Sequence, residues 1–231
     1  MLLDNPSEEL RLYQATVMLL SGQPRGGVDV LFFHNRSFGD YTGLFEIARA
    51  MIRQVGFITI TNNEGERVGS TTPYEANPGM SWCINQLTQK HRVPPEKILH
   101  PDMRAFHTRH ENEAFVKQAE ERGWLSGVIL AQPHQLLRAT LGMVQAMEQS
   151  GYMMAIYTAA PPDTPWQAEV RGNQGFQEKP RVDHIRDELE RVFRYQATGE
   201  LASFDELFTY LKARDIGKLF VGPIGQERFI R

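Results

Sequence analysis

Short runs of β-branched and aromatic residues alternate along this chain with segments whose apolar residues have helical spacing. The runs cover residues 28–33, 57–61, 127–131 and 153–158. Runs of this kind are typical of strands buried on both faces, and each intervening segment has room for a helix. The alternation predicts an α/β fold in which a mostly parallel sheet is sandwiched between two helical layers. Sheets of this type bind ligands at the carboxyl ends of their strands.

Helix signals fill the spaces between these runs. We expect helices over residues 43–54, 80–90, 108–122 and 135–149, and a short strand at 97–99. In the third of these helices, Thr108 followed by Glu111 has the pattern of a capping box, and Gly123 has the pattern of a helix end.

The N-terminal segment has the pattern of an amphipathic helix over residues 8–20, with Ser7 as its N-cap. Its expected buried face consists of Leu10, Tyr13, Val17 and Leu20. Charged residues interrupt the segment, so it lacks the unbroken apolar core of a signal peptide.

The chain has 231 residues, which is long enough for one large core. We expect residues 1–160 to form the α/β core and residues 161–231 to form a C-terminal extension. The extension begins with a stretch to residue 180 that is rich in Pro, Gly and Gln, which predicts a connector. Residues 181–197 and 204–214 then have the pattern of two amphipathic helices that pack on the core.

The net charge and the cysteine content indicate which classes of partner and which cellular compartment to expect. The formal net charge is −3, so the chain offers no general attraction for nucleic acid or anionic membranes. Cys83 is the only cysteine, so the chain forms no internal disulfide and its composition fits a reducing compartment. The apolar neighbours of Cys83 predict that its thiol is buried. No stretch reaches the roughly 18 apolar residues that a membrane span needs. We therefore expect a soluble, cytoplasmic protein that binds a small molecule, with its oligomeric state left open.

Polar side chains follow the expected strands directly, beginning with His34 after the first run. Because the carboxyl ends of parallel strands meet at one edge of a sheet, such residues are candidates for ligand binding. The candidates from these positions are Asn35, Arg36, Asn62, Asn63 and Gln132. No GxGxxG or P-loop pattern follows any of the strands, so the sequence does not predict a dinucleotide site.

Arg138 lies near the start of the helix after the central strand, where unpaired amides and the helix dipole attract anions. Its guanidinium suits a bidentate contact with a carboxylate or a phosphate. The alternative is a surface arginine that pairs with a nearby acidic side chain.

Histidines and acidic residues are dense between residues 100 and 111. Their spacing matches no zinc pattern, so we expect no metal site there. Histidines also serve as general acids and bases, and His110 and His134 are the candidates for such a catalytic role.

Four motifs follow one another in a characteristic order. They are Tyr74-Glu75-Ala76 at a Ser-Glu-Ala-like helix start, residues 92–98 at a Gly-Val-Pro-like step, residues 109–113 at a Thr-x-Glu-Asn-Ala-like motif, and residues 130–139 at a Val-Thr-Ser-x-x-His-x-x-Arg-Ala-like motif. Over residues 28–160 the chain resembles the YdcF/SanA/ElyC-type family. It departs from that family's pattern after the first two strands, where His34-Asn35 and residues 62–65 replace glycine-containing turns. Arg109 and Gln135 replace a threonine and a histidine in the last two motifs.

The resemblance implies a Rossmann-like three-layer sandwich with a C-terminal helical extension. Soluble members of the family are linked to S-adenosylmethionine, so the resemblance implies a nucleoside-like or adenosyl ligand. Glu75 or Glu111 would accept hydrogen bonds from its hydroxyls, Asn112 would orient it and Arg138 would hold an anionic end. Arg109, within the same motif as Glu111, joins these ligand-binding candidates.

Three functions stay open from the sequence. The first is a small-molecule-binding protein of the kind just described. The second is a hydrolase or transferase that acts on a phosphorylated or pyrophosphate substrate, with His110 or His134 as the acid or base. This second function leaves open a metal ion bound through Glu75, Glu111 or the histidines. The third is a non-catalytic sensor, in which ligand binding controls association through the C-terminal helices. The sequence does not decide whether the chain is an enzyme.

Overall fold

The computed structural model describes residues 7–24, 26–34, 40–64, 77–171, 178–223 and 228–229. Its central sheet has five parallel strands in the order β3-β2-β1-β4-β6. The strands are β1 (Val28–Phe33), β2 (Val55–Ile60), β3 (Ile98–Leu99), β4 (Ser126–Leu130) and β6 (Ala155–Ala159). The fold is α/β and Rossmann-like, as the alternation of strand and helix patterns predicts.

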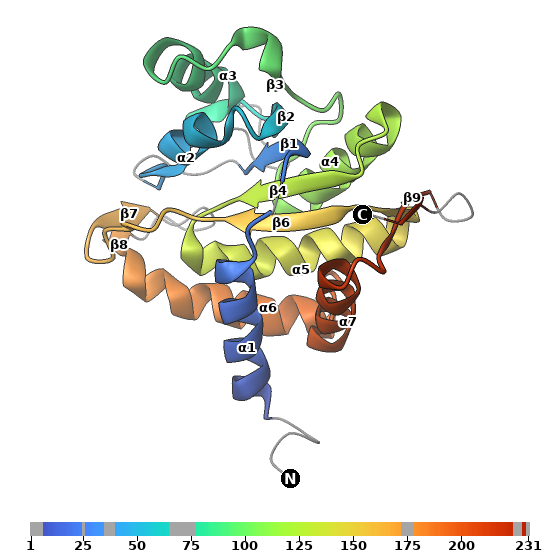
Figure 1. Ribbon diagram of the computed structural model, residues 1–231. Coiled ribbons are helices and arrows are strands. Elements are labelled where there is room, and N and C mark those ends of the chain that lie inside the picture. The colour runs from blue at the N-terminus through green and yellow to red at the C-terminus, as the bar shows by residue number, and fades with distance from the viewer. Residues whose placement is uncertain are drawn as a thin grey trace.

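Helices cover both faces of the sheet (Figure 1). On one face lie α2 (Leu44–Met51) and α3 (Gly79–Asn85), which continues as a π-helix over Gln86–Lys90. On the other face lie α4 (Thr108–Arg122) and α5 (Pro133–Ser150). The sheet therefore separates two apolar cores.

Side chains of β1 point alternately into the two cores, because successive side chains of a strand point to opposite faces of the sheet. Val30 and Phe32 pack in the core beneath α4 and α5, whereas Leu31 and Phe33 pack against α2 and α3. Cys83 is buried in the second core, as expected, and burial raises the pKa of its thiol to about 12.

The N-terminal helix α1 (Glu8–Ser21) begins at Ser7, whose Oγ accepts a hydrogen bond from a backbone amide of the first turn. The predicted buried face is wrong: Tyr13 is 68 % exposed, and Val17 and Leu20 are also exposed. Ala15 and Leu19 are buried instead, where α1 packs against α5 and β6. Apolar residues form two stripes on this helix, and its spacing alone does not indicate which stripe faces the core.

The C-terminal helices α6 (His184–Ala197) and α7 (Phe204–Asp215) confirm the expected extension. Figure 1 shows α6 beneath α5, on the side away from the sheet. The segment expected to be a plain connector contains a hairpin of β7 (Glu169–Arg171) and β8 (Glu178–Pro180). Within the described ranges, no helix is both long enough and apolar enough to cross a membrane.

The strand expected at 153–158 is in fact two strands, β5 (Tyr152–Met153) and β6. Tyr210 of α7 explains the break, because its hydroxyl donates to Met154 O and accepts from the Ile156 amide. β5 pairs antiparallel with β9 (Phe220–Pro223), which also pairs with β10 (Arg228–Phe229). The C-terminal segment therefore adds strands to the fold as well as helices.

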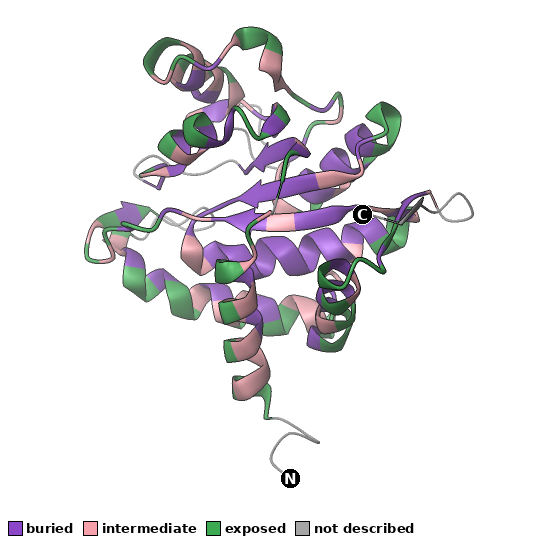
Figure 2. Cartoon of the chain, viewed as in Figure 1, coloured by how far each residue is buried: buried purple, intermediate pink, exposed green. Residues whose placement is uncertain are grey.

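The helix α5 is buried along most of its length, as Figure 2 shows. α4, α6, α1 and α7 all pack against it. Gln135, Arg138 and Thr140 of α5 are therefore buried, whereas residues 148–150 at the end of this helix are exposed.

Candidate functional site

The order of the strands in the sheet reverses between β1 and β4. The chain leaves β1 for α2 on one face and leaves β4 for α5 on the other, so the order reverses between these two strands. In open α/β sheets, ligands bind at this reversal point. Four polar residues that follow β1, β2 and β4 are buried near this edge. They are His34, Thr61, Asn63 and Gln132.

His34 and Glu111 form the most notable pair at this edge. His34 directly follows β1 and is fully buried, and its Nδ1 lies 2.8 Å from Oε2 of Glu111. Glu111 lies in the first turn of α4, where the helix dipole favours a carboxylate. A carboxylate in this position fixes the orientation of the imidazole and favours a proton on Nδ1. Such a pair can position a ligand or transfer a proton through the other ring nitrogen.

The pairing with His34 was not predicted, although the sequence places His34 directly after a buried strand. Its partner is 77 residues away in the chain, so only the fold brings the two side chains together.

Amide side chains at the same edge hold neighbouring loops. Gln132 donates through Nε2 to Asp40 O at 2.8 Å, and Asn63 donates through Nδ2 to Ala105 O at 2.7 Å. Asn62 donates to Pro101 O at 3.0 Å. In the part of the chain that the structure describes, Oε1 of Gln132 and Oγ1 of Thr61 are buried without a hydrogen-bond partner.

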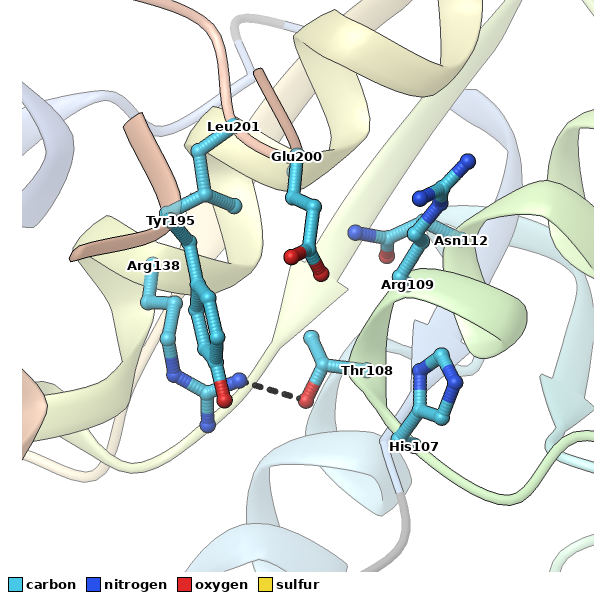
Figure 3. Close-up of a pocket in the computed structure, with 9 residues that line it drawn as sticks. His107, Thr108, Arg109, Asn112, Arg138, Tyr195, Glu200 and Leu201 are labelled. Carbon is cyan, nitrogen blue, oxygen red and sulfur yellow. Dashed lines mark hydrogen bonds between the residues drawn. The ribbon is translucent and has the colours of Figure 1, made fainter. Parts of the chain in front are cut away.

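A second group of candidates surrounds a cavity of about 160 Å³ between α4, α5 and α6 (Figure 3). The predicted ligand-binding residues Arg109, Asn112 and Arg138 meet here. The other lining residues are His107, Thr108, Gly142, Tyr195, Glu200 and Leu201.

Asn112 is fully buried where α4 crosses α5. Its Nδ2 donates to Ala139 O at 3.3 Å, whereas its Oδ1 is without a partner among the described residues. A Cβ at Gly142 would come within 2.6 Å of Nδ2 of Asn112, so this glycine leaves the space that the Asn112 amide occupies.

Arg138 is buried, so it is not the surface arginine of the alternative reading, although it does pair with an acid. Its Nε donates to Glu188 of α6 at 2.5 Å, and NH1 donates to Oγ1 of Thr108 at 2.7 Å. Burial acts to lower the pKa of Arg138, but Glu188 outweighs this effect and the pKa is raised. The guanidinium is therefore charged and ties α5 to both α4 and α6.

The capping box predicted from Thr108 is wrong. The N-cap of α4 is His107, whose Nδ1 accepts from the His110 amide at 3.4 Å. The hydroxyl of Thr108 accepts from Arg138 instead. Burial and the neighbouring His110 lower the pKa of His107, which favours the neutral ring that this cap requires.

The two histidines proposed as acid or base have different surroundings. The rings of His110 and His107 are in contact but tilted by 32°, with centroids 3.7 Å apart. The ring of His134 lies 6.2 Å from Trp166 and 6.4 Å from His184. The structure does not bring His110 and His134 together, whereas it pairs His34 with the buried carboxylate of Glu111.

No family model matches the chain, and no curated protein matches it significantly. The resemblance to the YdcF/SanA/ElyC-type family stays a prediction.

Three sequence candidates, Asn35, Arg36 and Glu75, lie outside the described residues. Within the described ranges, no group of three or more His, Cys, Asp or Glu side chains is arranged to hold a metal ion. The described ligand-binding candidates form two groups, one at the carboxyl edge of the sheet and one in the cavity of Figure 3, and His110 and His134 belong to neither group.

Proposed function

We propose that this protein binds a small molecule with a nucleoside-like or adenosyl group at the carboxyl edge of its sheet. The observation that carries the proposal is the set of buried polar atoms where β1, β2 and β4 end. A buried polar atom without a partner costs about 1–3 kcal/mol. A ligand that supplies partners to Gln132 and Thr61 would remove this cost.

The hydrogen-bonding character of these atoms fits such a ligand. A nucleoside carries ribose hydroxyls, and adenine carries an exocyclic amine, so both parts need acceptors. Oε1 of Gln132 and the carboxylate of Glu111 are acceptors, and the hydroxyl of Thr61 can donate or accept. Their placement at the reversal of strand order supports the same ligand class.

Calorimetric titration with adenosine, AMP and S-adenosylmethionine tests this proposal. We expect at least one of these compounds to bind, and we expect Glu111→Gln to weaken its binding at least about tenfold, because hydrogen bonds to a charged acceptor are the stronger ones. Glu113→Gln is the matched control on the same helix, since Glu113 pairs with Arg109 and not with His34. The unfolding free energy of both variants should be measured alongside.

Failure of all three compounds to bind, or equal affinity in Glu111→Gln and the wild type, would contradict the proposal. Release of phosphate from ADP, the substrate probe for hydrolysis, would instead favour the second function. In that case, the His34–Glu111 pair is the group placed to transfer a proton.

A further inference from the structure

The cavity between α4, α5 and α6 shares no lining residue with the described carboxyl-edge group. Glu111 and Asn112 are adjacent on α4 but belong to different sites, because Glu111 contacts His34 at the sheet edge and Asn112 contacts α5. A ligand in this cavity would therefore be additional to the nucleoside-like ligand proposed above, and the inference does not depend on that function.

Two hydrogen-bond acceptors point into the cavity (Figure 3). The first is Oδ1 of Asn112, which is fully buried and has no partner in the described part of the chain. The second is the carboxylate of Glu200, which accepts from Thr198 at 3.0 Å and forms no ion pair with any described residue. A charged acceptor beside a neutral one suits a ligand group that carries both a positive charge and several N–H donors. An ammonium group has this character.

The opposite wall of the cavity is electropositive. Arg138 lines this wall, and it shares the carboxylate of Glu188 with Arg191, which does not line the cavity. Thr108 begins α4, a helix of 15 residues, and the positive end of its dipole lies here. This wall favours an anionic group.

The size of the cavity limits the ligand further. A cavity of about 150 Å³ holds a molecule as large as benzene, so a volume of about 160 Å³ suits a compound of similar size and is too small for a nucleoside. Leu201, Gly142 and the ring of Tyr195 add apolar surface to the lining.

We propose that this cavity binds a small free α-amino acid. Its ammonium group lies at Glu200 and Asn112, its carboxylate lies toward Arg138 and Thr108, and its short aliphatic side chain contacts Leu201. A zwitterion satisfies both charged walls at once, whereas a ligand with a single charge satisfies only one of them.

Calorimetry on the full chain with L-valine tests the ligand class. Isovalerate lacks the ammonium group of valine and isobutylamine lacks its carboxylate, so they are matched single-charge probes. We expect L-valine to bind with a Kd of about 1 mM or lower, and both probes to bind at least about tenfold more weakly. L-Tryptophan is too large for the cavity and should not bind.

Glu200→Gln tests the position of the ammonium group. We expect this variant to weaken L-valine binding at least about tenfold and to leave isovalerate binding unchanged. Glu190→Gln is the control, because Glu190 is exposed on α6 and pairs only with Arg186 among the described side chains. Adenosine titrations of the Glu200→Gln variant should match the wild type, which separates this site from the proposed nucleoside site.

Three results would overturn the proposal. They are no binding of L-valine to the wild type at about 10 mM, isovalerate binding as tightly as L-valine, and unchanged L-valine affinity in Glu200→Gln.

Discussion

Arg138 and Glu188 form a buried ion pair that joins α5 to α6. Removal of one partner leaves the other charge in a place where water does not solvate it well. Glu188 also accepts from Arg191, so the pair belongs to a small network between the helices. At the scale of single residues, this network links the α/β core to α6, as the hydroxyl of Tyr210 links the core to α7.

We expect Arg138→Met to lower the free energy of unfolding by about 3–5 kcal/mol, because it removes the charge but keeps most of the side-chain length. Arg186→Met should change that free energy by no more than about 0.5 kcal/mol, since Arg186 and its partner Glu190 are exposed. Urea denaturation of both variants measures the difference. Equal losses would show that the buried pair contributes no more than a surface pair.

The sequence pattern predicted that Arg138 lies near the start of a helix, but it did not predict which residues Arg138 contacts. Glu188 is 50 residues away, and no local spacing relates the two. The same limit applies to His34 and Glu111. The sequence indicates that His34 follows a strand and that Glu111 lies at the start of a helix, but their pairing depends on the fold. Thr108 was read as a cap because the pattern is local, whereas its real partner is Arg138.

At the scale of elements, periodicity and end signals predicted α4, α5, α6 and α7 closely, because these signals are local. The break between β5 and β6 was missed because it depends on Tyr210 of α7. The buried face of α1 was also assigned wrongly. Its neighbours α5 and β6, and not its own spacing, decide which stripe is covered.

The packing of α1 provides a direct test of its observed face. Leu19→Ala should lower the free energy of unfolding by about 2–5 kcal/mol, because Leu19 is buried in the core beneath α5. Tyr13→Ala should change it by no more than about 0.5 kcal/mol, because Tyr13 is 68 % exposed. Thermal or urea unfolding of both variants measures the difference. A larger loss for Tyr13→Ala would mean that this side chain is covered in solution.

At the scale of the whole molecule, the fold brings buried polar residues together where β1, β2 and β4 end. The alternation of strands and helices was enough to predict a parallel sheet with such an edge, and a ligand site at this edge stays a prediction. The strand order, which places His34 and Gln132 on either side of the reversal, follows from long-range pairing and had to come from the structure.

A larger cavity of about 640 Å³ lies at the amino edge of the sheet, with Gly27 and Ser126 in its lining.

Amide chemical-shift mapping on isotope-labelled protein compares these two edges directly. With saturating S-adenosylmethionine or adenosine, we expect the largest shift changes at His34, Thr61, Asn63 and Gln132, because these residues follow the strands whose carboxyl ends meet there. Absence of any change at saturation, or changes confined to Gly27 and Ser126 at the amino edge, would contradict a ligand site at the carboxyl edge.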